Sequence, residues 1–104
     1  FKFIKSIKWG ETIDFDVIIN ATSIGLKNEE DFIIDYSDGK SGKFFYDVIY
    51  NPRNTKFLEK AEKKRNKIEN GKMMFIYQAH QSFTIWHKIM PKIDDDTIKL
   101  IEND

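Results

Sequence analysis

The chain has 104 residues, which suits one small domain or a piece of a larger one. Its 17 basic and 17 acidic side chains balance, and this argues against a duplex nucleic-acid binder, where an excess of Lys and Arg is expected. It has no cysteine, which excludes disulfides and thiolate metal sites, and no apolar run approaches the roughly 20 residues of a membrane-spanning helix. The chain begins at Phe1 and not at methionine, so we expect an internal start, and the composition predicts a soluble cytoplasmic protein.

Two compact apolar runs in the first half of the chain predict strands. The first covers residues 16–20 and has the pattern of a strand buried on both faces, as in a parallel sheet. The second covers residues 44–50 and is ended by Asn51 and Pro52, because proline cannot continue a ladder of hydrogen bonds. Residues 1–5 show a weaker form of the alternating strand pattern.

The second half of the chain predicts helices separated by short connections. A helix is expected over residues 55–68 with Thr55 as its N-cap, and residues 67–70 are a candidate for a short third strand. Gly71 then precedes a helix over residues 72–87, which is apolar on most sides, so we expect it to be largely buried.

A last short helix is expected to begin at a cap formed by Asp95 or Asp96 and to run through Glu102. The resulting order is strand, loop, strand, helix, short strand, helix. That order predicts an α/β unit with a mostly parallel sheet and flanking helices.

Two segments place unusual residues where ligands bind an open parallel sheet, at the carboxyl ends of its strands. Residues 20–25 (NATSIG) carry small side chains that let a planar ligand approach the backbone, and hydroxyls that can hydrogen-bond it. Tyr50 follows the second run, and its phenol can reach a substrate hydroxyl or carboxylate. From spacing alone, a plain turn and a tyrosine packed over the next helix are the favoured interpretations.

Gln78 is a third candidate, because it lies on a stripe with Met74, Gln81 and Ile85 along a helix that we expect to be buried. A buried amide without partners costs about 1–3 kcal/mol, and a polar ligand would satisfy it. An amide bonded to nearby backbone, or exposed at the rim, is the favoured alternative. Gly71 before this helix would supply a positive φ or allow a cofactor ring to approach closely.

Other features favour structural roles. His80 and His87 do not have the i, i+4 spacing of a zinc pair, so we expect no metal site. The acidic residues 94–96 suit a helix N-terminus, and the lysine-rich run 60–67 suits an exposed helix face. The chain contains no Gly-x-Gly-x-x-Gly motif, phosphate loop or nucleophile elbow. Reasoning from the residues alone therefore ends at half of a ligand-binding α/β domain.

Three segments, in order, resemble the shikimate dehydrogenase family. They are residues 16–25 (DVIINATSIG), residues 46–52 (YDVIYNP) with Thr55 following, and residues 70–79 (NGKMMFIYQA) running to Phe83 and Trp86. The resemblance implies that residues 1–90 form the C-terminal half of a Rossmann-like NADP-binding domain. It also implies that residues 91–104 form a C-terminal helix packing back toward a substrate domain outside this chain.

The family reduces 3-dehydroshikimate to shikimate with NADPH, in the route to aromatic amino acids. The residues implied to contact the cofactor NADP are Thr22, Val48, Gly71 and Met74, and those implied to bind the substrate are Tyr50 and Gln78. The family's catalytic lysine and aspartate, its phosphate loop and the motif that reads the 2′-phosphate would all lie upstream. We therefore expect no catalytic residue within this chain. The chain also departs from the family's pattern after Gly71, where Lys72 and Met73 replace the more usual leucine and small residue.

Two alternatives stay open. One is a quinate/shikimate paralogue that uses NAD, and the other is a non-catalytic ligand-binding module of the same fold. The implied partner is a small-molecule substrate, with no nucleic acid and no membrane, and a homodimer is left open. The isolated chain is expected to be inactive, because hydride transfer needs both reactants held together beside an acid–base group.

Overall fold

The computed structural model describes residues 2–102. The chain divides after Asn70 into two compact units, and each is described by itself. No helix among the described residues has the length and apolar character needed to cross a membrane.

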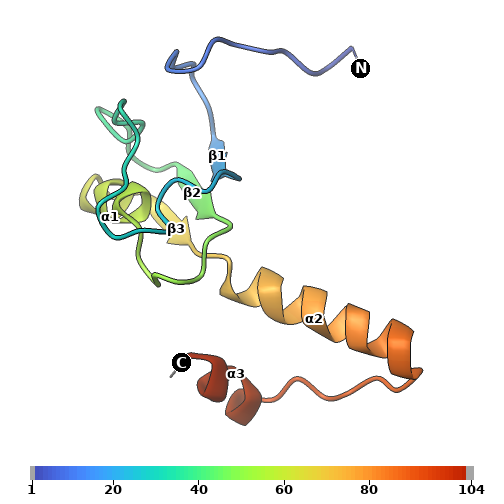
Figure 1. Cartoon of the computed structure of the whole chain (residues 1–104). Helices are drawn as coiled ribbons and strands as arrows, with labels where there is room; N and C mark the ends of the chain where they lie inside the picture. The colour runs from blue at the N-terminus through green and yellow to red at the C-terminus, as the bar shows by residue number, and fades with distance from the viewer. Residues whose placement is uncertain (1, 103–104) are drawn as a thin grey trace. The chain divides into compact units, whose positions relative to one another are not determined.

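The first unit is built on a parallel sheet of three strands (Figure 1). In order across the sheet they are β1 (Val17–Asn20), β2 (Phe44–Asp47) and β3 (Lys67–Glu69). The register pairs Ile18 with Phe45 and Asn20 with Asp47. Side chains alternate along a strand, so these four side chains lie on the same face of the sheet. The predicted parallel sheet is confirmed, whereas the second strand is shorter than residues 44–50.

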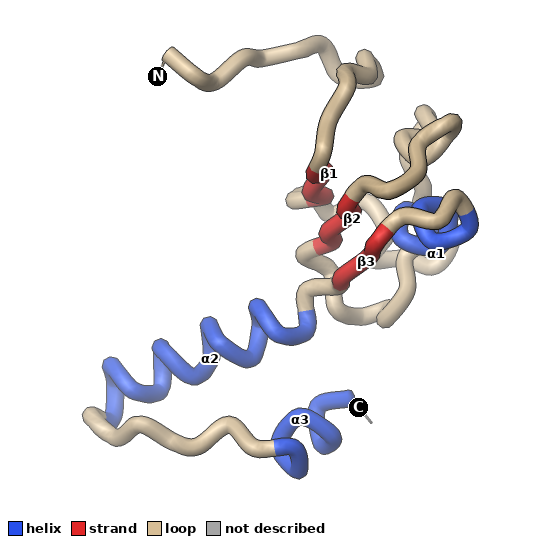
Figure 2. Tube along the Cα trace, turned by 180° about the vertical axis from the view of Figure 1, so that it is seen from behind, coloured by secondary structure: helices blue, strands red, loops and turns tan. Residues whose placement is uncertain are grey.

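One face of the sheet is covered by α1 (Lys56–Lys63), which lies beside the strands in Figure 2. Thr55 is its N-cap, as predicted, because the Thr55 hydroxyl accepts a hydrogen bond from the amide of Leu58. The side of α1 that faces the sheet buries Phe57, Leu58 and Ala61 around the fully buried Phe45. Burying a large apolar side chain contributes roughly 1.5–3 kcal/mol, so this cluster is the core of the first unit.

α1 is shorter than the predicted residues 55–68. It ends at Lys63, and Arg65 takes a left-handed backbone with a φ of 62°. The Asn66 carboxamide then accepts a hydrogen bond from the amide of Lys43 at 3.0 Å, just before β2. This bond holds the turn that leads into β3. The short third strand predicted at residues 67–70 is confirmed, because β3 pairs with β2.

On the opposite face of the sheet, the side chains of β1 are exposed, whereas those of β2 are half-buried. Val17 and Ile19 of β1 are 51% and 59% exposed, so the prediction of a strand buried on both faces is wrong for β1. The reason is that α1 covers only the other face of the sheet. Residues 2–5 form no strand, while Phe1 lies outside the described residues.

The second unit contains α2 (Lys72–His87) and α3 (Asp95–Glu102). The bounds of α2 are as predicted, but its burial is not, because Ile76 is the one buried residue that the structure describes within it. An apolar helix needs partners on most sides to be buried, and this unit supplies few. Gly71 has a φ of −82°, which excludes the first of its two predicted roles, a positive φ, while the close approach of a cofactor ring stays a prediction.

The N-cap of α3 is Asp94, and not Asp95 or Asp96 as predicted. The carboxylate of Asp94 accepts hydrogen bonds from the amide and the hydroxyl of Thr97, at 2.9 and 2.7 Å. These bonds satisfy one free amide of the first turn, and they lower the pKa of Asp94 below its usual value.

Candidate functional site

Asn20 holds the loop that follows β1 at the carboxyl edge of the sheet. It is 2% exposed, and its carboxamide oxygen accepts hydrogen bonds from the amide and the hydroxyl of Thr22, at 3.0 and 2.6 Å. Its nitrogen donates to the carbonyl of Ile24 at 3.0 Å and to the carboxylate of Asp47 at 3.2 Å. Reversing the carboxamide would set donor against donor at Thr22, so these contacts fix its orientation.

The hydroxyl of Thr22 takes part in two hydrogen bonds. It donates its hydrogen to Asn20 and accepts a hydrogen bond from the amide of Ile24 at 3.1 Å. A hydroxyl has one hydrogen and two lone pairs, so one lone pair remains. Toward a ligand, the half-buried Thr22 hydroxyl is therefore an acceptor of hydrogen bonds.

Asp47 joins three segments of the chain at the end of β2. It is fully buried, and its Oδ1 accepts from Asn20 and from the amide of Ile49 at 3.0 Å. Its Oδ2 accepts from the hydroxyl of Thr55 at 2.7 Å. A buried carboxyl is costly unless it is hydrogen-bonded, and here both oxygens have partners. The bond to Ile49 also turns the chain, which explains why β2 stops before residue 50.

Gly25 brings the loop after β1 against the start of α1. It has a φ of +110°, and a Cβ at this position would lie 3.1 Å from Cγ2 of Thr55 and 3.4 Å from Cδ1 of Ile49. Its amide donates to the carboxylate of Glu30 at 3.2 Å. Both the backbone conformation and the available space therefore require glycine here.

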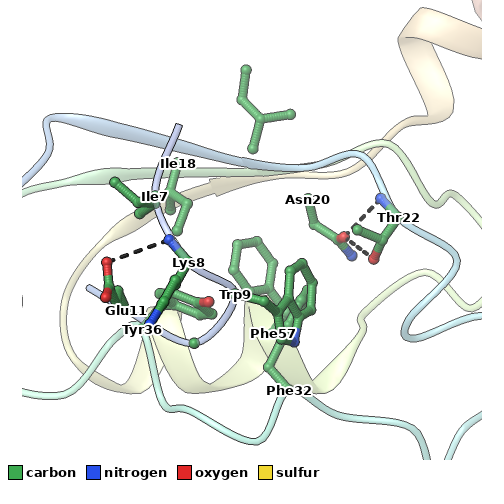
Figure 3. Close-up of a pocket in the computed structure, with 12 residues that line it drawn as sticks. Ile7, Lys8, Trp9, Glu11, Ile18, Asn20, Thr22, Phe32, Tyr36 and Phe57 are labelled. Atoms are coloured by element: carbon green, nitrogen blue, oxygen red, sulfur yellow. Dashed lines mark hydrogen bonds between the residues drawn. The ribbon is translucent and has the colours of Figure 1, made fainter. Parts of the chain in front are cut away.

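A cavity of about 250 Å³ lies beside Asn20 and Thr22 (Figure 3). Aliphatic and aromatic side chains form much of its wall, among them Ile18, Trp9, Phe32, Tyr36 and Phe57. An apolar wall with a few polar groups at one edge is typical of small-molecule sites. At this volume the cavity is smaller than a dinucleotide, so it cannot enclose a whole ligand of that kind.

Three predicted site residues lie at the ends of β1 and β2. The amide of Val48 donates to the carbonyl of Asn20 at 3.1 Å, so the two strand ends bearing Thr22 and Val48 are bonded directly. Tyr50 follows two residues later and is 42% exposed. The structure thus places Thr22, Val48 and Tyr50 along one edge of the sheet, and their contact with a ligand stays a prediction.

The other predicted site residues belong to the second unit. Met74 is 41% exposed, and Gln78 is exposed together with Gln81 and Ile85. The expectation that these four residues are buried is wrong, so the Gln78 amide does not need a ligand to satisfy its hydrogen bonds. An exposed helix face can still contact a ligand, and the roles of Gly71, Met74 and Gln78 stay predictions.

Asp47 was missed as a functional candidate. The available signal is an acidic residue inside the apolar run 44–50, which is expected to be buried and therefore needs partners. The identity of those partners, Asn20 and Thr55, depends on strand register and is invisible in the sequence. Among residues 2–102, no three His, Cys, Asp or Glu side chains gather as they would around a metal ion.

No family model matches the chain. A shikimate dehydrogenase (NADP(+)) of Pelagibacter ubique is 60% identical over 102 residues, which are 98% of this chain and 38% of that protein. The crystal structure of a shikimate dehydrogenase in complex with NADP+ matches with a TM-score of 0.67 at 32% identity, over 85% of this chain and 30% of that chain. Shikimate 5-dehydrogenase from Listeria monocytogenes, in complex with shikimate and NAD, gives 0.68 at 30% identity, over 84% and 30%.

The parallel sheet, the helix between β2 and β3, and these structural matches define part of a Rossmann-like α/β domain. The chain spans little more than a third of the length of the Pelagibacter ubique protein. It belongs to the shikimate dehydrogenase family and matches the C-terminal part of those proteins.

Proposed function

We propose that this chain is the C-terminal part of a shikimate dehydrogenase, which reduces 3-dehydroshikimate to shikimate with NADPH. The observation that carries the proposal is the 60% identity to the Pelagibacter ubique enzyme over nearly the whole chain. A role in aromatic amino acid synthesis and a cytoplasmic location accompany this proposal as predictions.

In this proposal, four residues face the cofactor: Thr22, Val48, Gly71 and Met74. What supports this is that the Thr22 hydroxyl, an acceptor of hydrogen bonds, adjoins a cavity of about 250 Å³ that could take part of NADP. The backbone at Val48 and Gly71 approaches the nicotinamide, and Met74 packs near its ring. Residues 1–90 make up this cofactor-binding half, and residues 91–104 pack toward the substrate domain.

The substrate is bound by Tyr50 and Gln78. A phenol and a carboxamide offer both donors and acceptors, which suits an acid that carries several hydroxyls. NADPH supplies a hydride to the carbonyl carbon of 3-dehydroshikimate, and the carbonyl oxygen takes up a proton. The proton transfer is assigned to the family's lysine and aspartate upstream, so this chain binds and orients without acting as the acid or base.

The direct test uses the full-length protein that carries this chain, purified and shown to be folded by circular dichroism. Shikimate-dependent reduction of NADP+ is then followed by the absorbance of NADPH. Turnover that requires both shikimate and NADP+ supports the proposal. A folded full-length protein without turnover contradicts it.

Gln78→Ala tests the substrate-binding residue. We expect the KM for shikimate to rise while the KM for NADP+ changes little, because the substitution removes contacts with the substrate alone. Gln81→Ala, three residues along the same exposed face, shows whether the effect belongs to position 78. An unchanged KM for shikimate in Gln78→Ala would remove this residue from the site.

The first alternative is a quinate/shikimate paralogue that uses NAD. The observation that favours this alternative is the complex of the Listeria monocytogenes protein with shikimate and NAD. Measuring kcat/KM for all four pairs of shikimate or quinate with NADP+ or NAD+ decides it. A larger value for quinate with NAD+ would replace the proposed reaction.

The second alternative is a non-catalytic ligand-binding module. It predicts that the full-length protein binds shikimate or NADP+ in calorimetry while turnover stays absent. The upstream sequence provides an independent check, because an enzyme must retain the lysine and aspartate of the family.

A further inference from the structure

We propose that Asn20 and Asp47 are positioning residues, which fix the loop after β1 against the turn after β2 and so present Thr22 and residues 48–50 to one ligand. The inference deepens the proposed function, because the ligand is taken to be NADPH.

The hydrogen bonds of Asn20 and Asp47 lead from one strand end to the other. Asn20 bonds Thr22 and the carbonyl of Ile24 on one side, and Asp47 bonds the amide of Ile49 on the other. The bond between Asn20 Nδ2 and Asp47 Oδ1, at 3.2 Å, is the link that joins them. The bonds of Asn20 and those of Asp47 therefore each end in a segment that carries a predicted ligand-binding residue.

The stability of the fold does not by itself require polar residues at positions 20 and 47. Asn20 and Asp47 are register partners on the face that α1 covers, and two residues earlier that face carries the apolar partners Ile18 and Phe45. Well-packed apolar residues commonly replace buried polar or ionic groups at no loss of stability. What an apolar pair would not provide is the set of fixed bonds to the two loops.

The same bonds set the polarity of Thr22. Because its hydroxyl hydrogen points at Asn20 Oδ1, the ligand group next to this hydroxyl must itself be a donor. In NADPH, a ribose hydroxyl or an amino or carboxamide N–H meets this requirement, whereas an ionised phosphate oxygen does not. Asn20 thus selects the kind of group that Thr22 receives without contacting the ligand.

Asn66 offers a matched control for Asn20. It is 8% exposed, and its carboxamide accepts from Lys43 and donates to the carbonyls of Lys40 and Ala61, at 3.0, 3.1 and 3.1 Å. It lies at the amino ends of β2 and β3, at the edge opposite Thr22. Its substitution therefore removes a similar set of buried hydrogen bonds away from the site.

The experiment compares Asn20→Ser and Asn66→Ser in the full-length protein. Both should lower the midpoint of urea unfolding by similar amounts. We expect the Kd for NADPH, titrated by its fluorescence, to rise at least about tenfold in Asn20→Ser and less than about twofold in Asn66→Ser, since misplaced contacts weaken binding steeply. Equal changes in Kd in the two variants, or no change in Asn20→Ser, would overturn the inference.

Substitutions of Asp47 test the link itself. Asp47→Ala should raise the Kd for NADPH about as much as Asn20→Ser, and the double variant should be no weaker than either single variant, because both changes break one chain of bonds. Asp47→Asn keeps one carboxamide oxygen for Asn20 and Ile49, so it should restore a Kd within about threefold of the unsubstituted protein. Additive losses would show two independent structural roles and would overturn the inference.

A second measurement keeps the test valid where Asp47→Ala unfolds or where the protein does not bind NADPH. Amide hydrogen exchange reports whether protection of Thr22, Ile24 and Ile49 falls more in Asn20→Ser than in Asn66→Ser, with Asp47→Asn expected to keep it because its oxygen still bonds Asn20 and Ile49. Selective loss at these amides supports the link even if shikimate turnover is absent, in which case only the proposed function fails. Uniform loss over the first unit would overturn the link and leave the proposed function standing.

Discussion

The α-carbon of Gly25 faces the side chain of Thr55, and a Cβ there would stand 3.1 Å from Cγ2 of Thr55. The loop after β1 and the start of α1 therefore touch without a side chain between them. Thr55 also donates to the buried carboxylate of Asp47 at 2.7 Å. Through these two contacts, the packing of α1 and the shape of the predicted cofactor loop depend on each other.

Gly25→Ala should destabilise the protein by roughly 2–4 kcal/mol, because alanine is strained at a φ of +110° and its Cβ crowds Thr55. Gly39→Ala is the control, since Gly39 also has a positive φ, of +64°, but nothing lies within 4 Å of its added Cβ. We expect about 1–2 kcal/mol there. Urea unfolding of the full-length variants measures both, and equal losses would show that the contact with Thr55 carries no cost.

Thr55→Val should destabilise the protein by about 2–4 kcal/mol. The substitution keeps the methyl group near Gly25 but removes the N-cap of α1 and leaves Oδ2 of Asp47 without its partner. Thr55→Ser keeps the hydroxyl and should cost less than about 1 kcal/mol. A valine variant as stable as the serine variant would mean that the hydroxyl contributes little to folding.

The features that were predicted correctly depend on residues that are close to one another along the chain. The N-cap at Thr55 and the start of α2 after Gly71 follow from local capping and periodicity, and both are confirmed. The bond between Asn20 and Asp47 joins residues 27 positions apart, and it depends on a strand register that local patterns do not specify. The predictions that β1 and α2 are buried were wrong for a related reason. An apolar pattern predicts that a face can be covered, but the covering layer must come from other parts of the fold.

Phe45 anchors the core of the first unit. It is fully buried, with ring centroids 5.6 Å from Phe15 and 5.3 Å from Phe57. Phe45→Ala should cost about 3–5 kcal/mol, because the cavity left behind cannot collapse completely. Ile33→Ala, at a side chain that is 96% exposed, should change the free energy of unfolding by less than about 0.5 kcal/mol. Similar midpoints for the two variants in thermal or urea unfolding would place the core elsewhere.

Ser37 makes the stability of the first unit depend on the ionisation of Asp35. Burial opposes the charge on Asp35, but hydrogen bonds from the hydroxyl and amide of Ser37, at 2.6 and 2.9 Å, and the charges of Lys60 and Lys64 outweigh it. The pKa of Asp35 is thereby lowered from its ordinary value of 3.8. A carboxyl whose pKa is lower in the folded state stabilises the fold above the unfolded-state pKa, and this contribution disappears as the pH falls through the folded-state pKa.

Ser37→Ala should therefore raise the pKa of Asp35 toward its ordinary value, which a pH titration of the side-chain carboxyl by NMR measures directly. At neutral pH the substitution should cost roughly 0.5–1 kcal/mol, at the low end for a hydrogen bond to a charged group because Asp35 is exposed. Below pH 3.8 the difference between Ser37→Ala and the unsubstituted protein should shrink as Asp35 takes up a proton. In an Asp35→Asn background the effect of Ser37→Ala should no longer depend on pH in this range. A pH dependence that survives there would assign it to another carboxyl group.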